Sequence, residues 1–199
     1  MDMDSPLDGS DAVTTNEVTA SVDRLVGKPE NYILHELCDA TEDAIQDGGG
    51  FGWVQVPERD RLMRYWTGMF LIPERKVVVS RVDGVISGAT QLHLSPPNNE
   101  AQAAIGTLTH HFVAPWARGK GLGSRQVLAV EGWAAELGLK ALKLDIRASQ
   151  GPAVKMLESL GYERWGTLDR YAFVDDQWVQ GHYYFKDIKD IKDIKDKSA

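Results

Sequence analysis

The chain of 199 residues lacks the features that mark several protein classes. Its single cysteine, Cys38, excludes an internal disulfide framework and a multi-cysteine metal site. No apolar run reaches bilayer-spanning length, and the acidic first residues are unlike a signal peptide. Basic residues are outnumbered, 22 against 29, and the net charge of −7 argues against a general nucleic-acid binder. We expect a soluble, cytoplasmic protein without a metal, a membrane partner or a nucleic-acid partner.

A glycine-rich turn is the most informative segment that is present. Gly119, Gly121 and Gly123 recur at every second position, next to Arg118 and Lys120. Glycines let a ligand approach the backbone, and successive amides at the start of a helix bind anions. The turn has neither the Lys-Ser/Thr end of a nucleotide P-loop nor the spacing of a dinucleotide fingerprint. It predicts a diphosphate-binding turn, and a connection without a ligand is the alternative.

Hydrophobic periodicity and turn signals predict one domain of alternating strands and helices. The expected strands run over 18–26, 76–82, 85–94, 103–113, 140–147, 162–168 and 179–185, and the expected helices follow Pro29, Pro57, the glycine-rich turn and Gln150. Asp83-Gly84 is a strong hairpin signal. The strand–turn–helix–strand unit over 103–147 implies a parallel pair inside a mostly antiparallel sheet. After the glycine-rich turn, the core-facing helix residues are expected to be Val127, Val130, Ala134 and Leu137.

Composition divides the chain into three parts. Residues 1–16 are acidic and rich in small polar residues, which predicts a flexible arm. Residues 17–187 form the expected domain. Residues 188–199 carry a Lys-Asp-Ile repeat with a period of three, which predicts a solvated tail; an amphipathic turn that packs on a partner is the alternative.

The glycine-rich turn and the stretch LKLDIRASQGPAVKMLESLGY resemble the GNAT superfamily of N-acetyltransferases, over about residues 17–186. Arg118 to Gly123 fits the pattern Q/R-x-x-G-x-G/A after a strand, and Leu160-Gly-Tyr162 fits the end of the second signature. The GGGFG loop, the LDxxA strand end and the closing Tyr-Phe-Lys are similar to the tabtoxin-resistance type. The resemblance implies an α+β fold with a mixed, mostly antiparallel sheet of six or seven strands. About four helices flank this sheet, and its central parallel pair is splayed.

The resemblance also implies acetyl-CoA as the cosubstrate. In that fold the central strand, here ending at Phe112-Val113, carries a β-bulge and diverges from the strand at 142–146. An amide near Val113 polarises the thioester carbonyl, and Gln150, where the family usually has Asn, contacts the cofactor arm. The implied cofactor-binding residues are Phe112, Val113, Arg118, Gly119, Lys120, Gly121, Leu122, Gly123, Ser124 and Gln150.

Two chemical positions depart from the family pattern. Thr107 stands where a glutamate is the usual general base, and Leu157 stands where a tyrosine usually protonates the departing thiolate. Asp145 keeps the aspartate at the end of the neighbouring strand and is expected to bind and orient the acceptor ammonium. Tyr171 and Tyr183 are the expected replacements for the missing acid.

Two adjacent histidines are the candidates for the base. An imidazole at His110 or His111 is expected to titrate near neutral pH, and strand alternation lets at most one of them face the cleft. Removal of the proton by water is the alternative.

The expected reaction is direct attack of a small-molecule amine on the thioester. Phe51, Trp53 and Trp66, with Asp145 and Tyr183, are the expected acceptor-binding residues. A protein or peptide N-acetyltransferase and a non-catalytic acetyl-CoA-binding module are the alternatives. We expect a monomer or a homodimer.

Overall fold

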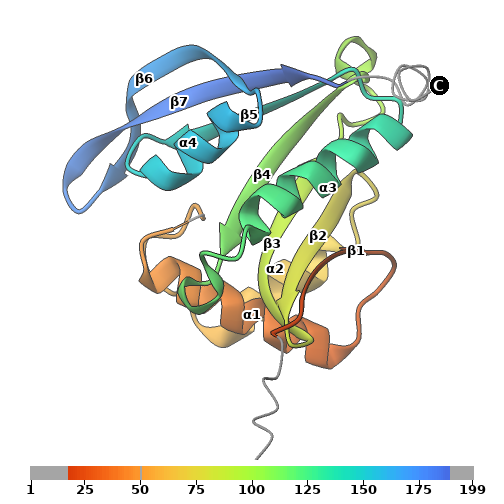
Figure 1. Ribbon diagram of the computed structural model, residues 1–199, viewed down its shortest axis with the longest axis vertical. Coiled ribbons are helices and arrows are strands. Elements are labelled where there is room, and N and C mark those ends of the chain that lie inside the picture. Colours follow the sequence, from red (N-terminus) through yellow and green to blue (C-terminus); the bar gives the residue numbers. More distant parts are fainter. Residues whose placement is uncertain (1–17, 50, 189–199) are drawn as a thin grey trace, which may run out of the picture.

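Seven strands form one sheet in the order β1-β2-β3-β4-β5-β7-β6 (Figure 1). The computed structural model describes residues 18–49 and 51–188, so the expected arm at 1–16 and the tail after Ile188 lie outside the described residues. The strands are β1 (Ala20–Leu25), β2 (Arg75–Val82), β3 (Val85–His93), β4 (Ile105–Val113), β5 (Ala141–Arg147), β6 (Glu163–Val174) and β7 (Gln177–Asp187). The helices are α1 (Asn31–Gln46), α2 (Arg59–Met69), α3 (Leu122–Glu136) and α4 (Gly151–Ser159), with short 3-10 turns η1 (Glu100–Gln102) and η2 (Pro115–Ala117).

The strand pairing confirms the expected fold class. β4 and β5 are parallel, and every other neighbouring pair of the sheet is antiparallel. The hairpin at Asp83-Gly84 is confirmed, with φ values of 49° and 84° that fit a two-residue turn of the type hairpins favour. Asp175 and Asp176 make a second turn of this kind, with φ values of 49° and 57°.

The two faces of the sheet carry separate hydrophobic cores. Because side chains alternate along a strand, Val77 and Val79 of β2 pack with α1 and α2, whereas Val78 packs with α3 and α4. Figure 1 shows α3 crossing the face of β1–β4 opposite α1 and α2. Ile188, expected to begin the tail, is buried in the second core, and its amide donates to the Lys140 carbonyl (2.8 Å).

The end of α3 corrects one expected core position. Leu137 is 43% exposed, whereas Leu139 is 4% exposed. The cause is a left-handed glycine cap at Gly138 (φ 77°), where the Leu139 amide donates to the Ala134 carbonyl (2.9 Å). This turn points the residue after the glycine into the core, and the helix ends before Leu137 can turn inward.

The central parallel pair separates after three residue pairs, as expected. Ile105, Gly106 and Thr107 pair with Ala141, Leu142 and Lys143, and beyond them β4 and β5 diverge (Figure 1). A β-bulge lies in the part of β4 that does not pair with β5. Across β3, Ala89 pairs with Phe112 and Gln91 with Thr109, so two histidines stand opposite one residue. The first of these, His110, has φ 49°.

Candidate active site

Two cavities adjoin where β4 and β5 separate. The acceptor cavity, as we name the larger one, has about 510 Å³ and lies between the α1–α2 loop, β4, β5 and the end of β6. The cofactor groove has about 360 Å³ and lies between the glycine-rich turn, the start of α3 and α4. His111, Gln150 and Ala153 line both. The two cavities therefore share part of their lining where the strands diverge, and we call them together the passage.

The cofactor groove is built around the N-terminus of α3. Gly121, the residue before this helix, has φ 70°, and Gly119 has φ 79°, a backbone conformation that residues with a Cβ rarely adopt. The first amides of a helix have no intrahelical acceptor, so those of α3 face the groove with the positive end of the helix dipole. Of the expected cofactor-binding residues, those lining the groove are Phe112, Val113, Arg118, Gly119, Gly121, Leu122, Gly123, Ser124 and Gln150. This shape and polarity fit a diphosphate.

The charges of the glycine-rich turn lie differently from what the sequence predicts. Arg118 pairs with Asp47 (2.5 Å), and its Nε donates to the Val113 carbonyl (3.1 Å). Lys120 is exposed and is not among the residues that line the groove. The Arg118 guanidinium thus ties the end of α1 to the end of β4. Of the two cations, Arg118 lines the groove beside the backbone amides and Lys120 does not.

Both bulge histidines line the acceptor cavity, although strand alternation predicts only one. The bulge breaks the alternation of side chains along β4, so the two rings point in different directions and both still line the cavity. His110 packs against Phe51 (5.3 Å between ring centroids) and Tyr65 (5.8 Å) on the α1–α2 side. A Cβ on Gly123 would lie 3.4 Å from Nε2 of His111, so this ring lies on the α3 side, beside the groove.

Neither histidine titrates in the range expected from the sequence. Desolvation lowers the pKa of His111 to about 4. Desolvation, followed by the charge of Arg75, lowers the pKa of His110 to about 4, against a smaller opposing effect of Asp145. Both imidazoles are therefore neutral near pH 7, and each is a weaker base than a solvent-exposed imidazole.

A buried polar network holds His111. Its Nδ1 lies 2.5 Å from the Thr90 hydroxyl, which donates to Oε1 of Gln126 (3.1 Å). The Gln126 amide donates to Ser80 (2.9 Å), whose hydroxyl lies 3.0 Å from that of Ser87. All four partners are fully buried. The network therefore holds the imidazole of His111 through Nδ1, and Nε2 points toward the passage.

Asp145 and Tyr171 meet at the acceptor cavity. The Tyr171 hydroxyl donates to the Asp145 carboxylate, and desolvation followed by this bond raises the pKa of Tyr171. The tyrosine ring rests on Gly181, where a Cβ would lie 2.1 Å from the ring. Tyr183 packs against Tyr171 and Trp165 and is not among the cavity-lining residues. Of the two candidate acids, Tyr171 is the one that reaches the cavity.

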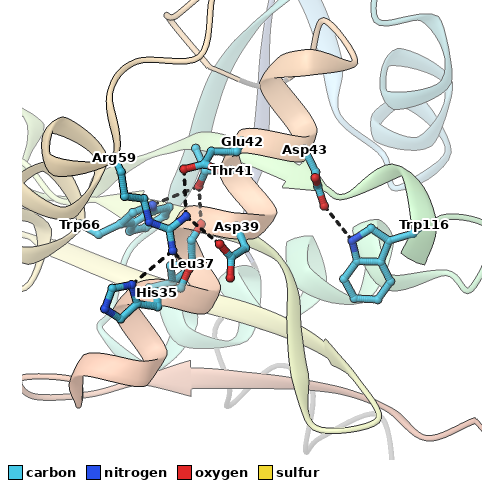
Figure 2. Close-up of polar contacts among 9 residues, drawn as sticks. All are labelled: His35, Leu37, Asp39, Thr41, Glu42, Asp43, Arg59, Trp66 and Trp116. Carbon is cyan, nitrogen blue, oxygen red and sulfur yellow. Dashed lines mark hydrogen bonds and ion pairs between the residues drawn. The ribbon is translucent and has the colours of Figure 1, made fainter.

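The expected aromatic wall is smaller than predicted. Phe51 lines the acceptor cavity, whereas Trp53 stacks on Phe51 (5.9 Å) behind it. Trp66 has no exposed surface, and its indole donates to the Thr41 hydroxyl (3.0 Å), so its assignment to the acceptor site is wrong. Figure 2 shows Trp66 directed at α1, beside the Arg59 guanidinium that bonds Asp39 and Glu42 of that helix. Helical periodicity identified the apolar face of α2 but not what that face covers.

The comparison with family models decides the family. The acetyltransferase (GNAT) family model matches residues 35–162, which include the glycine-rich turn, the bulge and α4. The chain belongs to the acetyltransferase (GNAT) family. It is therefore an acyltransferase. A protein of Azospirillum brasilense named an uncharacterized N-acetyltransferase in the hisH–hisA intergenic region is 53% identical over 117 residues, 59% of this chain and 70% of that protein.

Solved GNAT structures share the fold at low sequence identity. The phosphinothricin acetyltransferase of Sinorhizobium meliloti, in complex with acetyl-CoA, has a TM-score of 0.70 at 17% identity, over 85% of this chain and 89% of that one. The ribosomal-protein-alanine N-acetyltransferase of Brucella melitensis has a TM-score of 0.71 at 18% identity, over 84% and 99%. The first is named for a small acceptor and the second for a protein, so the fold does not identify the acceptor of this GNAT chain.

The departures from the GNAT pattern have clear places in the structure. Thr107 lies in the last residue pair that joins β4 to β5, outside the residues that line either cavity. Leu157, which the resemblance aligns with a tyrosine, lines the acceptor cavity with an apolar side chain that is 2% exposed. Among the described residues, no three His, Cys, Asp or Glu side chains gather as metal ligands. Burial raises the pKa of the lone Cys38 thiol to about 11.

Sequence reasoning missed several residues of this GNAT site. Thr90 and Gln126 are 36 positions apart and carry no local motif. Arg147 lines the acceptor cavity, two residues after Asp145 on β5, and this i, i+2 spacing on a strand was the signal that could have identified it.

Within the described part of the chain, no helix is long and apolar enough to cross a membrane.

Proposed function

We propose that this GNAT chain is an acetyl-CoA-dependent N-acetyltransferase of a small amine, with an acceptor range like that of the tabtoxin-resistance type. The observation that carries the proposal is the division of the passage into a groove and a cavity. The groove offers helix amides and glycines to a diphosphate. The cavity combines apolar residues such as Phe51 with polar and charged side chains of β4, β5 and β6. A walled cavity of about 510 Å³ suits a compact acceptor better than an extended peptide.

Acetyl-CoA supplies an activated acetyl thioester. The chain's own residues bind it and prepare the acceptor. Amides of the α3 N-terminus hold the diphosphate, and Gln150, at the junction of groove and cavity, borders the arm. Backbone groups of β4 beyond Thr107 have no partner on β5, so an amide near Val113 is available to polarise the thioester carbonyl.

The acceptor amine binds between Asp145 and His110. Asp145 attracts and orients the ammonium, and its charge is felt at His110, where it opposes the lowering of the pKa. The neutral imidazole of His110, or a water molecule held there, takes the proton that the attacking nitrogen must lose. The new C–N bond forms as the C–S bond breaks and the electron pair leaves on sulfur. The Tyr171 hydroxyl, or solvent, protonates the thiolate.

The test is release of CoA by the 199-residue chain, followed with a thiol reagent over matched panels of acceptors. One panel contains small amines, and the other contains peptides with a free N-terminus or a lysine side chain. We expect turnover with members of the first panel, and acetyl-CoA binding by calorimetry without any acceptor. Turnover confined to peptides would instead assign a protein acceptor. Acetyl-CoA binding without turnover on either panel would indicate a non-catalytic module.

A further inference from the structure

The acceptor cavity contains one carboxylate and one guanidinium. Among the described residues that line it, Asp145 and Arg147 are the ones with full charge. Both belong to β5, two positions apart, so both side chains point to the same face of the sheet, and their Cα atoms lie about 6.6 Å apart. Tyr171 bonds Asp145, and the charge of Arg147 lowers the pKa of Tyr171 against the larger effects that raise it. All three groups therefore share one electrostatic environment.

Arg147 faces the acceptor and not the cofactor. It lines the acceptor cavity and is not among the residues that line the groove, whereas Gln150 lines both. One Nη of Arg147 donates to the Gly48 carbonyl (3.1 Å), which places the guanidinium at the side of the cavity nearest the end of α1. In the part of the chain that the structure describes, no carboxylate forms an ion pair with it. A guanidinium has five N–H donors, so a bidentate site for an anion remains.

We infer that the acceptor is a zwitterion, an amine that carries a carboxylate or a similar oxoacid group a few bonds away. This inference rests on the proposed function, because it assigns the two ends of the same acceptor. The ammonium lies against Asp145, and the anion lies against Arg147. A spacing of about two strand residues suits an amino acid, whose two charged groups are separated by one or a few carbon atoms. Bidentate pairing with a planar oxoanion is the geometry that arginine supplies.

The rest of the cavity indicates the kind of side chain that such an amino acid carries. Away from the two charges the wall is mixed: Thr109, Gln150 and the two histidines are polar, whereas Phe51, Val54, Phe173 and Val174 form an apolar part. An apolar wall binds an aliphatic or aromatic side chain without leaving polar groups unpaired. We therefore expect leucine- or phenylalanine-like amino acids, or analogues of that size, to be better acceptors than amino acids with a second charge.

The experiment compares matched acceptors that differ at the anion alone. Leucine and phenylalanine are each assayed beside the decarboxylated amine and the carboxamide, with rates corrected for the unprotonated fraction of each amine. We expect wild-type kcat/KM to favour the acids by at least about tenfold, since a site built for a polar group rejects analogues that lack it. Equal kcat/KM for acids and decarboxylated amines would overturn the inference and leave the proposed function intact. No CoA release with any member would also overturn the inference, whereas the proposed function is decided separately by the wider panel of small amines.

Arg147→Gln separates charge from position. Glutamine retains an N–H donor for the Gly48 carbonyl but has no positive charge. We expect KM to rise for the acids and to stay within about twofold for the decarboxylated amines, which removes the preference. Arg147→Lys should restore part of it, because a point charge replaces the bidentate fork. An equal loss for both members of each pair would show that Arg147 merely holds the α1–α2 loop, and would overturn its assignment to the anion.

Discussion

The Thr90 hydroxyl lies 2.5 Å from Nδ1 of His111 and donates its one hydrogen bond to Oε1 of Gln126. It can therefore only accept from the imidazole, so Nδ1 carries the proton and Nε2 presents a lone pair to the passage. The tautomer of a ring at the junction of cavity and groove is thus set by a threonine on the neighbouring strand. A sequence pattern could not indicate this, because the partners meet only through sheet pairing and helix packing.

Thr90→Val should release this tautomer. With no acceptor at Nδ1, the neutral ring should populate both tautomers, and ¹⁵N NMR of labelled histidine reports which nitrogen is protonated. Thr90→Ser should retain the wild-type spectrum. Thr109→Val is the matched control, since its hydroxyl lies 3.1 Å from Nδ1 of His110. A wild-type His111 protonated at Nε2 would contradict the assignment.

Stability should fall as the pH falls from about 6.5 to about 4. The pKa of His111 is lowered from 6.5 to about 4 in the folded chain, so in this window the unfolded chain binds a proton that the folded chain does not. The loss for this residue is at most about 3 kcal/mol and is absent above pH 6.5. Urea unfolding at pH 4.5 and pH 7.5 measures it. His111→Gln should lose less stability than the wild type; an unchanged difference would mean that the ring is not buried in its neutral form.

The same pKa values predict the pH dependence of activity. An imidazole base at His110 with a pKa of about 4 places its limb of the kcat/KM profile below pH 5, not near 6.5. Any rise between pH 6 and 9 then reports deprotonation of the acceptor amine and shifts when an acceptor of different pKa is used. A limb near pH 6.5 that disappears in His110→Ala would instead show that bound acetyl-CoA raises this pKa.

Gly121→Glu should abolish acetyl-CoA binding while the fold is retained. The left-handed φ of 70° costs a residue with a Cβ about 1–2 kcal/mol, and the carboxylate adds repulsion where the diphosphate binds. Gly138→Glu is the matched control, because this glycine has a φ of 77° at the far end of α3. Both variants should lose similar stability in denaturant titration, and only the first should lose affinity in calorimetry. Equal affinities would remove the diphosphate from the turn.

Trp66→Phe should cost stability rather than acceptor affinity. The substitution leaves the buried Thr41 hydroxyl without its indole donor and leaves a gap in the core, at a cost of about 1–3 kcal/mol. Phe51→Leu reshapes the cavity wall and should raise the acceptor KM more than the acetyl-CoA KM. An acceptor KM well above the wild-type value in Trp66→Phe, at unchanged stability, would show that Trp66 belongs to the acceptor site.

Tyr171→Phe should lower kcat and leave acetyl-CoA affinity unchanged. The variant removes the hydroxyl that bonds Asp145 and that we propose as a proton donor to the thiolate. Gly181→Ala tests the same group indirectly, because the added methyl would displace the Tyr171 ring that rests there. The two variants should have similar kinetics. If Tyr171→Phe has the wild-type kcat, solvent protonates the thiolate.

The sequence was informative wherever a feature was local. The hairpin at Asp83-Gly84 and the glycine-rich turn were predicted because each depends on residues near one another in the chain. The parallel pair was predicted from the order strand, turn, helix, strand. Trp66 was misplaced because an apolar helix face does not reveal whether a core or a cavity lies against it. The two histidines were misjudged because a bulge changes where strand side chains point and because their burial depends on distant elements.

The three residue pairs between β4 and β5 join two parts of the sheet, and each part comes from one continuous stretch of the chain. β1–β4 and α1–α3 precede the turn at Gly138, and β5–β7 and α4 follow it. The cofactor groove takes Gly121 and Ser124 from the first part and Pro152 and Met156 from the second. A chain cut at this exposed turn would yield two fragments whose reassembly a ligand in the groove favours, so fragment complementation would serve as a sensor of cofactor binding that needs no acceptor.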